Sequence, residues 1–340
     1  MNLPELNLRK VSIIAAQGLV ITIMASSLVL LFTSSGDTLQ QFRDNVRWHH
    51  SPLLILPVFL SWSCNGSRFY MMCRCLGHRI SWRRALAIAV SSEFGALASP
   101  GGVGGAAIRL GFLKKSGVPF VHSGALLAAD VFLNMVFFSV LTPFALYSLL
   151  SYRSFNEAPS YGAWNPVWLL VLLIPTMLIL TRKRLYSLIC RQRAFQKYRL
   201  GSRIRLFRKK MLHGVRQGRT AVALIFRNHR GALAVNLALT AVQFCSRYSI
   251  LPIAIWLLGI EINPIPLIVM QGALYVISMV LVAPGGGGSV EVLAAVALPQ
   301  LMPVNLVGIA ILLWRLFTYH FYLIVGGSVF AVTFRKLMRN

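Results

Sequence analysis

Long apolar runs dominate the pattern of hydrophobic and polar positions along the chain. Six of them come close to or exceed the roughly 20 residues that a helix needs to cross the hydrocarbon core of a bilayer. We predict transmembrane helices over residues 11–32, 53–72, 121–150, 164–181, 231–259 and 304–334. The pattern therefore predicts an all-α polytopic membrane protein, with residues 1–340 forming a single membrane domain.

Two further apolar stretches, residues 85–113 and 266–301, are each interrupted by a glycine cluster. The first cluster is SPGGVGG at residues 99–105, and the second is PGGGG at residues 284–288. Glycine permits positive φ and lets the backbone approach another chain closely, so each cluster predicts a sharp turn between two short helices. We expect two helical hairpins with these clusters at their tips.

Charge places the loops on the two sides of the membrane. The chain has 34 Lys and Arg residues against 8 Asp and Glu, which gives a net charge of +26. Only 12% of the residues are charged, where soluble domains have about 25%, so a soluble protein is excluded. The basic excess suits an anionic membrane face rather than nucleic acid. Because Lys and Arg collect in cytoplasmic loops, we expect the basic loops and both termini in the cytoplasm.

The most basic segment, residues 182–230, has 16 Lys and Arg residues and no acidic residue. It is expected in the cytoplasm as an ordinary positive-inside loop. A second interpretation is a surface that gathers anionic lipid or docks a cytoplasmic or membrane lipid-modifying enzyme.

The same charge bias orients the two hairpins. Basic pairs at 83–84 and 114–115 flank the first broken stretch, so this hairpin is expected to be re-entrant from the cytoplasm. The second broken stretch lies between two outward span ends, so its hairpin is expected to enter from the opposite side. Residues 53–150 and 231–334 are thus predicted to be repeats of inverted topology. Many secondary transporters are built in this way and bind substrate near the midplane.

Charged residues occupy corresponding places in the two repeats, with opposite signs. Arg109 and Glu291 follow the two tip prolines by nine and seven residues, and Asp130 and Arg315 follow them by thirty and thirty-one. An ionised side chain at the bilayer centre costs about 2.5–3.5 kcal/mol, so these groups are expected to face inward and form pairs. The expected ion pairs are Asp130 with Arg109 or Arg68, and Glu291 with Arg315 or Arg247.

Two interpretations of these charges remain open. They are either structural ion pairs that hold the hairpins in place, or a site in which arginines bind an anionic headgroup while carboxylates balance charge or carry a proton. Arginine suits phosphate because its planar fork donates two hydrogen bonds at once, and helix N-termini at the glycine tips supply backbone donors. The candidate substrate-binding residues are Arg68, Arg109, Arg247, Arg315, Gly101, Gly102, Gly104, Gly285 and Gly286. The candidate charge-balance or proton residues are Glu93, Asp130 and Glu291.

Motifs for other chemistry are weak. The five cysteines lack the spacing of a zinc site. Residues 102–107 formally match the dinucleotide fingerprint G-x-G-x-x-A, but that motif requires a strand before it, and an apolar membrane helix is expected here. We therefore expect no metal, no cofactor and no enzymatic activity. An intramembrane enzyme built from the buried acids and histidines is the alternative.

The two glycine motifs resemble the flippase-like family of the lysylphosphatidylglycerol synthase transmembrane region, the membrane part of multiple peptide resistance factor proteins. The first match is residues 99–105 followed by Arg109, Gly117 and Asp130. The second is residues 284–291, similar to the family's P-G-G-x-G-x-x-E, with Gly287 where an apolar residue is usual. The likeness runs from about residue 11 to residue 334, without a soluble aminoacyl-transferase domain, so lysyl-lipid synthesis is not expected.

The resemblance implies translocation of lipids between leaflets of a bacterial or archaeal cytoplasmic (inner) membrane. Together with the inward charges, it predicts a flippase-like transporter that moves an anionic phospho- or polyprenyl-type lipid headgroup, with anionic membrane lipids as its partners. The alternatives are a small-solute or ion transporter of the same architecture and a membrane partner of a lipid-modifying glycosyltransferase.

Overall fold

The computed structural model describes residues 48–99, 102–155, 219–280 and 288–339, with short pieces within 20–32 and at 216–217. Every regular element in these residues is helical, which confirms the predicted all-α class. The predicted span 164–181 and most of 11–32 lie outside the described residues, as does most of the basic segment 182–230.

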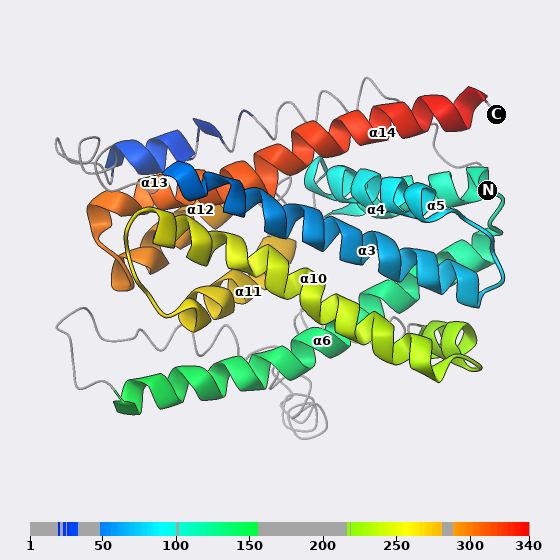
Figure 1. Ribbon diagram of the computed structural model, residues 1–340, viewed down its shortest axis with the longest axis horizontal. Coiled ribbons are helices and arrows are strands. Elements are labelled where there is room, and N and C mark those ends of the chain that lie inside the picture. The colour runs from blue at the N-terminus through cyan, green and yellow to red at the C-terminus, as the bar shows by residue number, and fades with distance from the viewer. Residues whose placement is uncertain are drawn as a thin grey trace, which may run out of the picture.

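The helices follow one another along the chain, and residues 156–229 separate α6 from α10 (Figure 1). In the first half they are η1 (Trp48–Leu54), α3 (Ile55–Cys75), α4 (Trp82–Leu97), α5 (Val103–Lys115) and α6 (Phe120–Phe155). In the second half they are α10 (Arg230–Leu257), α11 (Pro264–Val280), α12 (Ser289–Ala297), η3 (Leu298–Gln300), α13 (Val304–Arg315), η4 (Leu316–His320) and α14 (Phe321–Arg339).

Three helical segments are long and apolar enough to cross a membrane, within the described residues. They are Phe120–Ser139 in α6, Arg230–Leu257 in α10, and Val304–Leu337, in which α13 and α14 are joined through the π-helical turn η4. These correspond to three of the six predicted spans. Helix α3 lies where the span 53–72 was expected. Its serines, Asn65 and Arg68 make it more polar than the three apolar segments.

The distribution of side chains is that of a membrane protein. Val121 and Val296 are 76% and 64% exposed, although both are apolar, and Ile324 is 62% exposed. Arg68 and Glu291, in contrast, are 1% and 0% exposed. An apolar exterior around a charged interior is stable in hydrocarbon, where polar groups must find partners within the protein.

Helices from both halves pack side by side. Helix α3 packs along α10, and α14 packs along α4 (Figure 1). Gly326 and Gly327 on α14 allow the second contact, because a Cβ at either would lie within 3.2 Å of the Phe94 side chain. The site described below is therefore held by an interface between the two halves.

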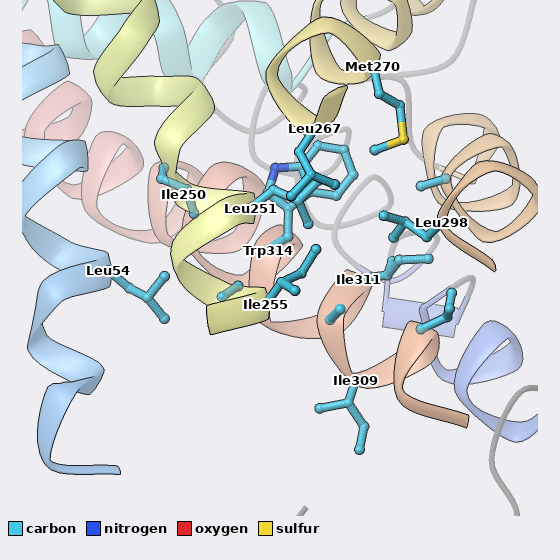
Figure 2. Close-up of a cluster of buried hydrophobic side chains, with 14 of the residues drawn as sticks. Leu54, Ile250, Leu251, Ile255, Leu267, Met270, Leu298, Ile309, Ile311 and Trp314 are labelled. Atoms are coloured by element: carbon cyan, nitrogen blue, oxygen red, sulfur yellow. The ribbon is translucent and has the colours of Figure 1, made fainter. Parts of the chain in front are cut away.

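An apolar cluster surrounds the end of α10 and joins it to α11, η3 and α13. Figure 2 shows side chains of α10, α11, η3 and α13 pointing toward one another, with Leu54 from η1 at the side of this group. The labelled members are Leu54, Ile250, Leu251, Ile255, Leu267, Met270, Leu298, Ile309, Ile311 and Trp314.

Helices α4 and α5 form an antiparallel hairpin that is packed through glycine. A Cβ at Gly104 would lie 2.5 Å from the carbonyl oxygen of Gly95, and one at Gly105 would lie 2.5 Å from that of Ser92. Helix α5 already begins at Val103, so Gly104 and Gly105 belong to its first turn rather than to the tip, where the sequence analysis placed them. The helix can begin this early because Ser99 Oγ accepts a hydrogen bond from Gly104 N at 2.8 Å.

The start of each post-tip helix has the same backbone feature. Gly102 precedes α5 with φ of 72°, and Gly288 precedes α12 with φ of 83°. Both values lie in the region that favours glycine. The other tip residues, Pro100 and Gly101 in the first cluster and residues 284–287 in the second, lie outside the described residues.

Candidate functional site

Asp130 on α6 is shared by two arginines from the first half. Its Oδ1 accepts from Arg68 Nη2 at 2.9 Å, and its Oδ2 accepts from Arg109 Nη1 at 2.6 Å. Both alternatives left open by the sequence are therefore present together. All three side chains are buried, so the carboxylate offsets two charges that would each be costly alone.

Arg68 donates four hydrogen bonds to side-chain acceptors among the described residues. Besides Asp130, Nη2 donates to Asn134 Oδ1 at 2.9 Å, and Nη1 donates to Gln243 Oε1 at 2.6 Å. Nε donates to Asn236 Oδ1 at 3.2 Å. These acceptors come from α6 and α10, so Arg68 ties three helices together. The bonds favour the structural interpretation for this arginine.

Arg109 is positioned within the first hairpin. Its Nε and Nη2 donate to Ser92 Oγ on α4 at 3.3 and 3.1 Å. Its guanidinium carbon lies 5.3 Å from the centroid of the Phe69 ring, a cation–π geometry. A hydroxyl group and an aromatic face compensate little of the positive charge of Arg109. Most of this charge is balanced only by the carboxylate of Asp130, which Arg109 shares with Arg68.

Glu291 and Arg315 form the expected pair in the second half. Arg315 Nε donates to Glu291 Oε1 at 2.7 Å, and the guanidinium lies 5.0 Å from the centroid of the Tyr319 ring. Among the described residues, Nη2 of Arg315 and Oε2 of Glu291 have no hydrogen-bond partner although both are buried. A buried donor left unpaired costs about 1–3 kcal/mol, so this pair is better suited to a ligand than Arg68 is.

A third pair connects the halves. Arg247 Nη1 on α10 lies 3.9 Å from Glu93 Oε2 on α4, a longer contact than the other pairs. Asn65 Nδ2 donates to Glu93 Oε1, and the guanidinium of Arg247 lies 5.0 Å from the centroid of the Tyr322 ring. The partner predicted for Arg247 from the sequence was Glu291. The spatial partner is Glu93 because α4 packs beside α14 and α3, which brings it close to α10.

One cavity of about 380 Å³ joins these groups. Its volume falls within the range of small-molecule sites, about 300–1,000 Å³. Its charged lining is Glu93, Arg109, Asp130, Arg247 and Arg315. Its other polar lining includes Asn65, Ser92, Asn134, Gln243, Tyr248, Gln271 and Thr318.

The structure thus brings together most of the predicted site. Gly102 lines the cavity, whereas Arg68 and Glu291 support it from behind through Asp130 and Arg315. Gly104 packs inside the first hairpin instead. The remaining predicted site residues, Gly101, Gly285 and Gly286, lie outside the described residues.

The amide side chains of the site were not among the residues predicted from the sequence. Asn236 and Gln243 are seven residues apart on α10, with Thr240 between them, so they share one helix face. Asn134 follows Asp130 by one turn on α6. Polar residues at this spacing in an apolar helix indicate a polar interior face, and that signal could have found them.

The fold and the cavity define a helical membrane protein with a charged internal site shared between two halves. Comparison with known proteins gives the family: residues 14–326 match the lysylphosphatidylglycerol synthase transmembrane region, and the chain belongs to that family. It is also similar to a UPF0104 membrane protein of Archaeoglobus fulgidus, at 24% identity over 324 residues, which cover 91% of this chain and 94% of the relative. No solved structure matches the chain.

Proposed function

We propose that this protein moves an anionic lipid headgroup between the two leaflets of a bacterial or archaeal cytoplasmic membrane. The observation that carries the proposal is the cavity itself, in which three arginines and two carboxylates from both halves surround about 380 Å³. Membership of a family described as a lipid synthase transmembrane region supports a lipid substrate. Arginine supplies the planar fork that suits phosphate oxygens.

The architecture that we propose for this function has six spans and two opposed re-entrant hairpins in an inverted repeat, with both termini cytoplasmic. The α4–α5 hairpin and the positive-φ glycines before α5 and α12 support it. So does the opposite arrangement of charge, with Arg109 after the first tip and Glu291 after the second. Inverted repeats place substrate near the midplane, where the described cavity would then lie.

In the proposed mechanism, the phosphate contacts Arg109, Arg247 and Arg315, while Glu93, Asp130 and Glu291 hold these arginines in the absence of substrate. Because a headgroup can replace the long Glu93–Arg247 contact, substrate binding loosens one link between the halves. Alternating access requires such a loosening, since the halves must move against each other.

Reconstitution tests the proposal. Purified protein in vesicles with fluorescent phosphatidylglycerol should accelerate its exchange between leaflets, measured as the fraction protected from a membrane-impermeant quencher. Arg109→Ala and Arg315→Ala should each lower the rate at least tenfold, whereas Arg74→Ala, at the exposed end of α3, should not. If both cavity variants exchange the lipid as fast as wild type, the site assignment is wrong.

A further inference from the structure

The net charge of the cavity sets a limit on the ligand that it can hold. With all groups ionised, the described lining has three arginines and two carboxylates, which leaves one positive charge. Including Arg68 and Glu291, which pair with the lining, gives four arginines and three carboxylates and the same excess. On the described residues, both counts therefore give a cavity that is neutralised by one negative charge.

The excess charge has a definite location. Among the residues that the structure describes, Glu93 and Glu291 each have one arginine within 4.0 Å, whereas Asp130 has two. Arg68 does not line the cavity, and its described hydrogen bonds hold the lining residues Asp130, Asn134 and Gln243 from behind. The positive charge that faces the cavity at this end therefore belongs to Arg109.

Arg68 also orients two neutral donors. Its bonds engage Asn134 through Oδ1 and Gln243 through Oε1, so both amide NH₂ groups are turned away from the guanidinium. Both residues line the cavity. They can donate to neutral oxygen atoms of a ligand, while the unpartnered Nη2 of Arg315 can donate to a charged one.

We propose that the cavity selects a monoanionic phosphodiester whose second substituent is neutral and rich in oxygen, and that it rejects diphosphates and headgroups with added amino groups. This inference rests on the proposed function and specifies its substrate class. A diphosphate would leave negative charge uncompensated in a buried site, and a zwitterionic or amino-bearing headgroup would leave positive charge, each at a large desolvation cost.

The experiment measures which lipid the purified full-length protein retains. Protein in detergent is incubated with equimolar phosphatidylglycerol, phosphatidylcholine, lysylphosphatidylglycerol and undecaprenyl diphosphate, and the bound lipid is quantified by native mass spectrometry. Phosphatidylglycerol should exceed each competitor about tenfold. If undecaprenyl diphosphate is retained as well as phosphatidylglycerol, the charge limit is wrong although the proposed transport of anionic lipid stands. If no anionic lipid exceeds phosphatidylcholine, both proposals fail.

Isosteric variants place the selectivity in the cavity. Glu93→Gln and Glu291→Gln each add one positive charge and should raise the retained ratio of diphosphate to phosphatidylglycerol about tenfold. Glu261→Gln removes the same charge from an exposed loop and should leave the ratio unchanged. If neither cavity variant shifts the ratio more than Glu261→Gln, the charge count does not govern binding. Glu93 lines the cavity and Glu291 lies behind it through Arg315, so these two independent positions keep the test valid if one variant does not fold.

A double variant separates net charge from the donor. Glu291→Gln with Arg315→Gln restores the excess of one positive charge but removes Nη2. Its ratio of diphosphate to phosphatidylglycerol should return to the wild-type value while total retained lipid falls. A ratio that stays at the value of Glu291→Gln alone would overturn the charge argument.

A soluble diester distinguishes a lipid from a solute. Dimethyl phosphate at millimolar concentration should not displace bound phosphatidylglycerol, because a lipid ligand is also held by its chains. Displacement at micromolar concentration would assign the cavity to a water-soluble phosphodiester and overturn the lipid assignment.

Discussion

The imidazoles of His78 and His122 meet at 2.8 Å, from Nε2 of one to Nδ1 of the other. His78 lies in the connection before α4, and His122 lies in the first turn of α6, just after α5. The chain that enters the first hairpin and the chain that leaves it are therefore at the same end of the molecule. This contact supports a hairpin that enters and leaves the membrane on one side.

Cysteine labelling should show this topology. Arg79→Cys before α4 and Lys115→Cys at the end of α5 are both exposed and should react from the cytoplasmic side. Glu261→Cys, in the connection between α10 and α11, should react from the opposite side. The measurement is the labelling of intact cells by a membrane-impermeant maleimide, with inverted vesicles as the comparison.

The variants for this labelling need a background without Cys75, Cys190 and Cys245. Cys190 lies outside the described residues, and Cys64 and Cys73 are buried. A full crossing by the α4–α5 segment would put Arg79→Cys and Lys115→Cys on opposite sides. That result would exclude the re-entrant hairpin, and with it the inverted repeat.

The histidine contact predicts a pH dependence of stability. Burial lowers the pKa of His78, and the neighbouring His122 lowers this pKa further. Because the pKa of His78 is lower in the folded state, the unfolded chain binds more protons between that value and the ordinary value of about 6.5. The stabilising contribution of neutral His78 is complete above about pH 6.5 and is lost as the pH falls through this window.

Thermal unfolding of the purified protein between pH 7.5 and 5 measures this effect. In His78→Gln the fall of Tm with acidification should be shallower than in wild type. His229→Gln, in the exposed turn before α10, is the matched control and should keep the wild-type slope. Identical slopes in all three proteins would mean that the contact does not couple to folding.

Much of the site could be predicted from sequence because charge in an apolar helix must find a partner. This reasoning predicted Asp130 with its arginines and Glu291 with Arg315, and the distances confirm both pairings. The substrate role of these residues stays a prediction. The all-α class followed in the same way from the long apolar runs.

Other features depend on packing that sequence spacing does not encode. Glu93 and Arg247 are far apart in the chain and meet only because helices of the two halves lie side by side. The early start of α5 depends on the hydrogen bond from Gly104 N to Ser99 Oγ, which the glycine count alone could not indicate. The amide residues carry no charge, so the cost argument that revealed the ion pairs did not apply to them.

Glycine packing in the first hairpin predicts a sharp difference between two alanine substitutions. Gly105→Ala would place a Cβ 2.5 Å from the Ser92 carbonyl oxygen and 2.8 Å from Ala96 Cβ, so we expect a loss of about 1–3 kcal/mol. Gly124→Ala on α6 meets nothing within 4 Å and should gain about 0.5–1 kcal/mol from helix propensity. Tm in detergent measures both. Equal Tm values would show that α4 and α5 are not closely packed.

The hydrogen bonds of Arg68 predict that the shape of this side chain matters more for stability than its charge. Arg68→Lys keeps the positive charge but cannot reach Asp130, Asn134, Asn236 and Gln243 together, because an ammonium lacks the planar fork. Breaking a buried ion pair costs about 3–5 kcal/mol. At about 2–4 °C per kcal/mol for a protein of a few hundred residues, we expect Tm to fall by about 10 °C. Arg74→Lys, at the exposed end of the same helix, should change Tm little. If Arg68→Lys unfolds at the wild-type temperature, the bonds from Arg68 to α6 and α10 do not stabilise the fold, and Arg68 must be reconsidered as a ligand of the headgroup.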